Sequence, residues 1–383
     1  HDTATQTYTA HPLIRNHYLA LLSKGKSQEK EAHDQIKDYY LSIAGDTPQY
    51  PSLEDLRPLI EVVHHACEAG AHEEGFQIYQ QRIRQMNRNV DTHTLGAYET
   101  SLSIISEFFP DRDATKEPAV SDQDKKRWIL NAIGFRLMSL GRLREGVPFY
   151  ERSIAGEEGQ DWSGDSLTYQ NLAELHASLG ALEESATAAQ QALDLSRRAE
   201  KKDGQCFSLA FQGLANHLLG NTQTASDAFA GAEKFQQEIY SQQNIRYLFS
   251  LRGIQHADYL RRTDHPSTGS GNAGYARRMT EANLDLMERN HWPDDESRCH
   301  RILGDLDADS GNHTSAREHY EPALKIARGI SHRSVLIEAL LGRGRWQAKY
   351  LVGGGYSAPG QGDLAPTVNR CLQRPERSPW LCG

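Results

Sequence analysis

The sequence predicts an all-α fold in which antiparallel helix pairs stack side by side into a right-handed solenoid. Three observations support this prediction. A pattern of small and aromatic residues recurs with a period of about 40 residues. The hydrophobic fraction is only 38%, which suits the thin core between stacked helices better than one large spherical core. Finally, no stretch shows the sustained alternation of apolar and polar residues that is typical of strands.

The recurring pattern is most complete between residues 130 and 150. Two antiparallel helices approach closely only where side chains are small, and an aromatic ring then fills the space beside the crossing. Between the helices the chain needs a left-handed residue, a conformation that glycine adopts without strain. Large apolar, small, turn and aromatic positions are occupied in this segment by Leu130, Ile133, Gly134, Leu137, Gly141, Gly146 and Tyr150.

The pattern recurs in register along the chain. Further copies lie at residues 172–192, 209–232 and 302–323, and a looser copy lies at residues 59–79. A single copy is a weak signal, whereas five copies in register are a strong one. The glycines predicted at helix crossings and turns are Gly70, Gly134, Gly141, Gly180, Gly213, Gly220, Gly304 and Gly311.

These residues resemble the tetratricopeptide repeat family, and the matched segments cover most of residues 53–328. The period of about 40 residues exceeds the ~34 residues of the standard repeat, so both helices are expected to be longer. The resemblance implies a surface that binds other proteins and is not an enzyme. We therefore expect no catalytic residue and no cofactor.

The ends of the chain differ from its middle. Residues 1–48 are predicted to form an N-terminal helical segment with helices over Pro12–Leu22 and Gln28–Ala44. The solenoid is expected over residues 49–351. Residues 352–383 are rich in glycine and proline and show no helical period, so we expect an irregular tail.

Two segments interrupt the regular stack. Leu95–Phe109 has the apolar period of a helix and is followed by a loop that extends to Pro118. Tyr247–Leu260 keeps the spacing of the repeat but lacks its turn glycine. The next residues, Thr263–Asn272, have the composition of a flexible insertion.

A second resemblance concerns the first residues of the chain. His11–Tyr18 is similar to the closing segment of the winged-helix region in STAND-type NTPases. Glu61–Cys67 and Lys125–Leu140 resemble tetratricopeptide sensor regions that follow NACHT-like ATPase modules in bacteria. The resemblance implies that this chain is the sensor arm of a larger bacterial signalling ATPase. Because the sequence lacks an initiator methionine, we expect it to begin inside a longer protein.

Composition excludes several other classes of protein. The formal net charge of −9 argues against a nucleic-acid-binding surface, which is normally basic. No run approaches the ~18 apolar residues of a membrane helix, so no membrane association is expected. The five cysteines form no CxxC pair, which favours reduced thiols in a cytoplasmic protein.

Three motifs resemble ligand sites and are rejected. Ala20–Ser27 imitates a phosphate-binding loop but contains a single glycine and follows a predicted helix. Asp305, Asp307 and Asp309 imitate a calcium loop that lacks its required glycine and its bidentate glutamate. The pairs His64-His65 and Cys299-His300 point to different helix faces, so no metal site is expected.

The binding surface of such a solenoid is the concave face, which the first helix of each pair lines. A protein or peptide is the expected ligand. The alternative is a scaffold or self-assembling protein with no sensing role. Placing the repeat on each first helix predicts the partner-binding residues Asn131, Phe135, Met138, Gln170, Glu174, Ser178, Leu214, His217, Arg298, Arg301 and Asp305.

The last predicted helix, Arg333–Leu351, has no second helix to complete its pair. It carries Val335, Leu336, Ile337, Leu340, Leu341 and Trp346, more apolar surface than one neighbour can cover. Either the tail folds back over this face, two chains bury it together, or the native protein continues with more repeats. We favour the last, with weak homodimerisation of this chain as its consequence.

Overall fold

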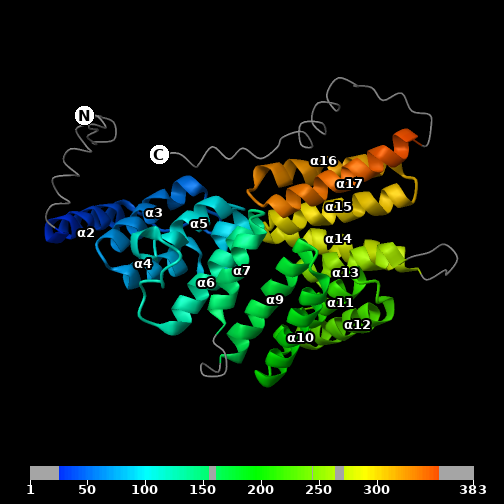
Figure 1. Ribbon diagram of the computed structural model, residues 1–383. Coiled ribbons are helices and arrows are strands. Elements are labelled where there is room, and N and C mark those ends of the chain that lie inside the picture. The colour runs from blue at the N-terminus through cyan, green and yellow to red at the C-terminus, as the bar shows by residue number, and fades with distance from the viewer. Residues whose placement is uncertain (1–25, 155–160, 244, 264–270, 353–383) are drawn as a thin grey trace.

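The computed structural model describes residues 26–154, 161–243, 245–263 and 271–352, and every regular element within these ranges is a helix (Figure 1). This confirms the predicted all-α fold. None of the described helices is both long and apolar enough to cross a membrane. The predicted helix Pro12–Leu22, most of the insertion Thr263–Asn272 and the tail from residue 353 lie outside the described residues.

Consecutive helices pair and the pairs stack in chain order, which gives the predicted solenoid. α2 (Lys26–Ile43) packs on the first pair, and α17 (Arg333–Val352) packs on the last pair without a second helix of its own. The division of the chain at residue 48 stays a prediction. The pairs are α3 (Leu53–Glu68) with α4 (His72–Ile78), α6 (Gln123–Ser139) with α7 (Leu143–Ser153), α9 (Trp162–Leu179) with α10 (Leu182–Arg198), α11 (Lys202–Leu218) with α12 (Thr222–Ile239), α13 (Ser250–Thr263) with α14 (Asn272–Asn290), and α15 (Pro293–Asp309) with α16 (His313–Gly329).

The turn glycines are left-handed. Gly141 and Gly180 have φ angles of 75° and 76°, a region that side chains with a Cβ rarely adopt. The amide of the residue after each glycine donates back into the helix, as from Ala181 to the His176 carbonyl at 2.9 Å. The same left-handed geometry occurs at Gly70, Gly220 and Gly311.

The helix crossings require small residues. A Cβ added to Gly304 would lie 2.9 Å from the ring of Tyr320, which is 1% exposed. The same contact with an aromatic ring occurs at two earlier pairs, between Gly134 and Tyr150 and between Gly213 and Phe229. Each aromatic ring therefore fills the space that its crossing glycine leaves open.

The segment between the first two pairs is less regular than predicted. α4 continues into a π-helical turn, η1 (Tyr79–Ile83), and two short turns follow, η2 (Met86–Arg88) and η3 (Val90–Thr94). The helix expected over Leu95–Phe109 is shorter, since α5 spans only Tyr98–Ser106. Gly96 is left-handed with a φ of 57°, which prevents an earlier start. The turn η4 (Pro110–Arg112) follows.

This irregular segment closes the solenoid on itself. In Figure 1, α5 lies beside the near ends of α15 and α16. The Ser331 amide donates to the Gly96 carbonyl at 3.0 Å, and the Ser331 hydroxyl donates to the same oxygen at 2.9 Å. The Tyr98 hydroxyl donates to the Asp294 carboxylate. As a result, α15 and α17 face the earlier first helices across the concave side of the solenoid.

Candidate functional site

The concave face holds two cavities, of about 430 and 300 Å³, lined largely by the first helices of the pairs. Glu174, Leu251 and Arg298 line both cavities, so the two cavities adjoin along the concave face. We call this feature the inner groove. Its other principal lining residues are His93, Phe135, Gln170, Phe207, Phe211 and His332 in the larger cavity and Ser178, Leu214, His217, Asp258, Arg301, Glu338 and Arg345 in the smaller one.

Most residues predicted for the concave face are brought together in the inner groove. These are Phe135, Gln170, Glu174, Ser178, Leu214, His217, Arg298 and Arg301. They come from four helices, α6, α9, α11 and α15. Whether a partner touches them stays a prediction.

Three predicted residues are placed elsewhere, and this corrects the register at those positions. Met138 is 3% exposed and belongs to the hydrophobic core, where it clusters with buried residues such as Tyr150 and Leu172. Asp305 is 5% exposed and accepts a hydrogen bond from the Tyr320 hydroxyl at 2.6 Å. Asn131 joins two helices instead, donating to Thr168 and accepting from Asn171.

The groove residues of α13 and α17 are not among the predicted partner-binding residues. α13 lacks the turn glycine that sets the register, so the sequence does not place Leu251 or Asp258 on the concave face. α17 contributes Ser334, Glu338 and Arg345. The residues of α17 can be predicted from sequence, because Arg333–Leu351 has the pattern of a first helix. Placing the repeat on this helix would assign residues to the concave face as for the other first helices.

Buried arginines of α15 tie three first helices together. Arg298 is 6% exposed, and its guanidinium lies 3.3 Å from Glu338 on α17 and 3.4 Å from Asp295. Arg301 lies 3.0 Å from Asp305 and 3.8 Å from Asp258 on α13. Because these charges already have partners inside the protein, Arg298 and Arg301 form a fixed wall of the inner groove.

The pKa values of two carboxyl groups in the inner groove are shifted in opposite directions. Burial would raise the pKa of Asp258, but the guanidinium groups of Arg301, Arg261 and Arg262 hold that pKa at about 2. Desolvation raises the pKa of Glu174 to about 7, with Arg298 opposing the shift. Asp258 therefore stays ionised at neutral pH, whereas Glu174 changes its charge near neutral pH.

The carboxylates of Asp305, Asp307 and Asp309, which imitate a calcium loop in the sequence, form ion pairs within the protein. Asp305 accepts from Arg301 at 3.0 Å, and Asp307 forms an ion pair with Arg277 on α14. Asp309 pairs with Arg261 at 2.6 Å. Because the three residues are two positions apart, they lie on different sides of the helix, and each carboxylate pairs with an arginine. Most of the phosphate-loop imitation, Ala20–Ser27, lies outside the described residues.

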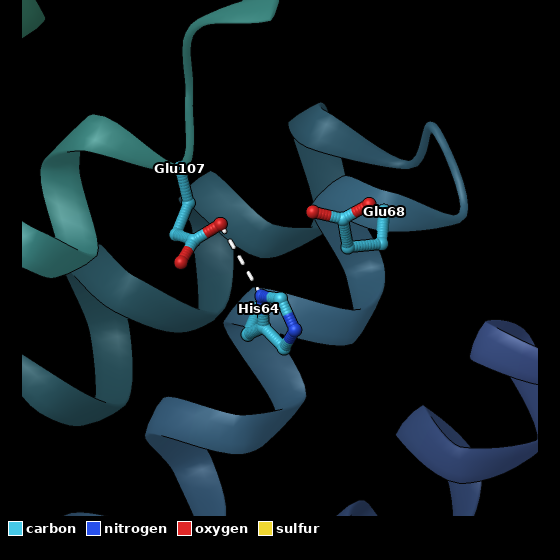
Figure 2. A group of neighbouring side chains, drawn as sticks. All are labelled: His64, Glu68 and Glu107. Carbon is cyan, nitrogen blue, oxygen red and sulfur yellow. Dashed lines mark hydrogen bonds and ion pairs between the residues drawn. The ribbon is translucent and has the colours of Figure 1, made fainter. Parts of the chain in front are cut away.

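One group of possible metal ligands lies between the first pair and α5. Figure 2 shows His64 turned toward Glu107, with Glu68 apart from that contact. The His64 Nδ1 lies 3.3 Å from Glu107, which raises the pKa of His64. The Arg112 guanidinium lies 2.7 Å from the same carboxylate and 3.0 Å from His64 Nδ1. An arginine therefore already supplies the positive charge at this group.

A second group of possible ligands consists of Glu288, Glu296 and His300. His300 also faces His319, with 3.2 Å between their Nδ1 atoms. Burial, together with the neighbouring His319, lowers the pKa of His300 to about 4. His300 therefore lies beside side chains of α14 and α16, which sequence spacing alone could not reveal.

Comparisons with known proteins agree with this architecture. Residues 167–204, which span most of α9 and all of α10, match the family described as Tetratricopeptide repeat. This match supports the tetratricopeptide resemblance and indicates a protein-interaction module. No curated protein matches the chain. Among solved structures, the chain is similar to BtubC (BKLC) from P. vanneervenii, with 14% identity, a TM-score of 0.39, and coverage of 70% of this chain and 94% of that one.

Proposed function

We propose that this chain binds a peptide or an extended segment of a partner protein in the inner groove, as the ligand-sensing arm of a larger cytoplasmic signalling ATPase. The observation that carries the proposal is that two cavities adjoin along α9, α11, α13, α15 and α17 and share the lining residues Glu174, Leu251 and Arg298. An extended chain needs a continuous channel, whereas a small ligand needs only one enclosed cavity.

The chemistry of the groove favours a peptide over a purely apolar ligand. The groove is lined both by apolar side chains such as Leu214 and Leu251 and by charged groups such as Arg262 and Arg345. Arg345 is exposed and its guanidinium lies 3.8 Å from Asp305, so it can turn toward a ligand at small cost. Mixed apolar and polar lining matches a ligand with alternating side chains and a polar backbone.

Peptide display tests the binding proposal directly. Peptides selected on the intact chain should lose binding when Ser178, an exposed residue of the groove, is changed to tryptophan. The matched control is Thr187→Trp, which adds the same ring to the exposed face of α10, outside the groove. Selected peptides that bind the two variants equally well would contradict the proposal.

The sensor role rests on the resemblance of His11–Tyr18 and requires a separate test. The native gene should encode a nucleotide-binding ATPase before residue 1. If it does, a selected peptide should change the ATPase rate of the whole protein. A gene without such a domain would favour the alternative, a scaffold whose groove holds a partner without regulating an enzyme.

A further inference from the structure

Three ligand-type side chains converge away from the inner groove, where α14 meets α15. Glu288 lies in the last turn of α14, Glu296 in the first turn of α15, and His300 one turn later. Glu296 and His300 are four residues apart, so they share one face of the helix. One ligand atom from each of the three residues lies within 4.8 Å of the others. We propose that Glu288, Glu296 and His300 bind a zinc ion.

Among the described residues, neither Glu288 nor Glu296 forms an ion pair with an arginine or lysine. The cationic neighbour of Glu296 is the imidazole of His291, which opposes the rise in the pKa of Glu296 that burial and Glu288 cause. Like charges at this separation repel each other, and a divalent cation would remove the repulsion. The group around His64 differs in this respect, because Arg112 already neutralises Glu107. Of the two groups, only the one on α14 and α15 has a place for an added cation.

A second observation comes from the residues behind His300. Asp307 is 4% exposed, and its Oδ2 atom has no hydrogen-bond partner. This oxygen lies 3.8 Å from Nε2 of His319, and Nδ1 of His319 lies 3.2 Å from Nδ1 of His300. The three side chains therefore form a row, Asp307, His319 and His300, that ends at the proposed site.

The contact between the two Nδ1 atoms requires that one of them carries a proton. In the proposed site His300 donates from its Nδ1, and its Nε2 keeps the lone pair that a metal requires. Metal-binding histidines commonly have such a partner on the second nitrogen, which fixes the tautomer and the ring orientation.

The ligand set suits zinc. Zinc binds imidazole nitrogen and carboxylate oxygen at about 2.0–2.2 Å in tetrahedral geometry, so water completes the site after three protein ligands. The ion would join the end of α14 to the start of α15 and, through His319, to α16. This placement predicts that zinc stabilises the C-terminal pairs of the solenoid. The proposal revises the sequence-based expectation that the chain holds no metal.

Zinc titration of the chelator-treated full chain, in competition with a chromophoric chelator, tests the site. We expect one saturable site per chain, a higher melting temperature with zinc, and a cobalt absorption band typical of imidazole and carboxylate ligands. His300→Asn should abolish this site, and His319→Asn should weaken it about 10- to 100-fold. His64→Asn, the matched control in the other group, should leave the affinity unchanged.

Glu288→Gln separates loss of a ligand from loss of the fold. Glu288 is exposed, so the amide should leave the helical circular dichroism unchanged while it abolishes the zinc-induced rise in melting temperature. The proposal is overturned if the folded wild-type chain shows no saturable zinc site. It is equally overturned if Glu288→Gln and His300→Asn both retain wild-type affinity, or if His64→Asn removes the site instead.

Discussion

Tyr98 and Asp294 are 196 residues apart in the sequence, yet the tyrosine hydroxyl donates a hydrogen bond to the aspartate carboxylate where the solenoid closes on itself. Both residues are buried, and the second carboxylate oxygen of Asp294 has no hydrogen-bond partner. The ring of Tyr98 also packs edge-on against His332, with 4.9 Å between centroids. This contact joins the N-terminal part of the chain to its last helices, and therefore holds the inner groove in shape.

Tyr98→Phe should destabilise the chain by about 1–3 kcal/mol, because it leaves the buried Asp294 carboxyl without its donor. Urea unfolding followed by circular dichroism measures the change. Tyr39→Phe removes the same hydroxyl from a ring that is 50% exposed, and should leave the midpoint unchanged. Equal midpoints for both variants would show that closure does not depend on this hydrogen bond.

Stability should fall as pH rises through the neutral range. Burial raises the pKa of Asp294 to about 7, against the opposing effects of Tyr98 and Arg298. A carboxyl with a raised pKa binds its proton more tightly in the folded chain than in the unfolded chain. Its contribution is therefore present below its ordinary pKa of 3.8 and is lost as pH rises toward about 7. Desolvation of Glu174 acts in the same direction.

The measurement is the free energy of unfolding at pH 5 and at pH 8 for the wild type and Asp294→Asn. The amide cannot ionise, so the difference between the two pH values should shrink in the variant. Asp285→Asn, a change on the exposed surface of α14, controls for the loss of one charge. If the free energy of unfolding of Asp294→Asn differs between pH 5 and pH 8 as much as that of the wild type, Asp294 is not the group responsible for the pH dependence.

Gly304→Ala should destabilise by about 1–3 kcal/mol through overpacking. The new methyl group would lie 2.9 Å from the Tyr320 ring, which cannot move without opening the crossing. Gly344→Ala makes the same change in α17 where nothing lies within 4 Å, and should stabilise by about 0.5–1 kcal/mol. A lower denaturant midpoint for Gly304→Ala and a higher one for Gly344→Ala, each relative to the wild type, would support the crossing geometry. A Gly304→Ala variant that is more stable than the wild type would refute it.

The open face of α17 should cause weak self-association. Ile337 is 54% exposed and Leu340 is 37% exposed, so the last helix leaves apolar surface uncovered within the described residues. Light scattering over a concentration series should show a rise in mass that Ile337→Glu removes. Leu53→Glu, a comparable change of an exposed leucine on α3, should have no effect. A wild-type chain that stays monomeric at high concentration would exclude a dimer through this face.

The helix pairs could be predicted because their determinants are local. Gly304 and Tyr320 belong to one pair, and both the crossing and its aromatic filler are visible within 20 residues of sequence. The turn at Gly180 likewise depends only on its neighbours. Closure of the solenoid could not be predicted, because it depends on the small rotation between successive pairs added over the whole stack. The contact between Tyr98 and Asp294 forms only because these rotations together bring the two ends of the stack side by side.

The same reason limits what sequence could reveal of the site. The sequence predicts Arg298 and Arg301 as partner-binding residues of the concave face. In the folded chain α17 and Glu338 lie opposite them, and both guanidinium groups are buried. The ligands Glu288 and His300 belong to consecutive helices, and their approach depends on how tightly the two-residue connection folds. Sequence spacing identifies neither contact.

Photo-crosslinking of a display-selected peptide tests most directly whether the inner groove is the binding surface. A benzophenone placed at successive positions of the peptide should label groove residues such as Ser178, Leu214 and Glu338. Labelling should disappear in Ser178→Trp and persist in Thr187→Trp. Crosslinks confined to the outer helices α10, α12 and α14, unaffected by Ser178→Trp, would contradict the proposal that this chain binds its partner in the groove.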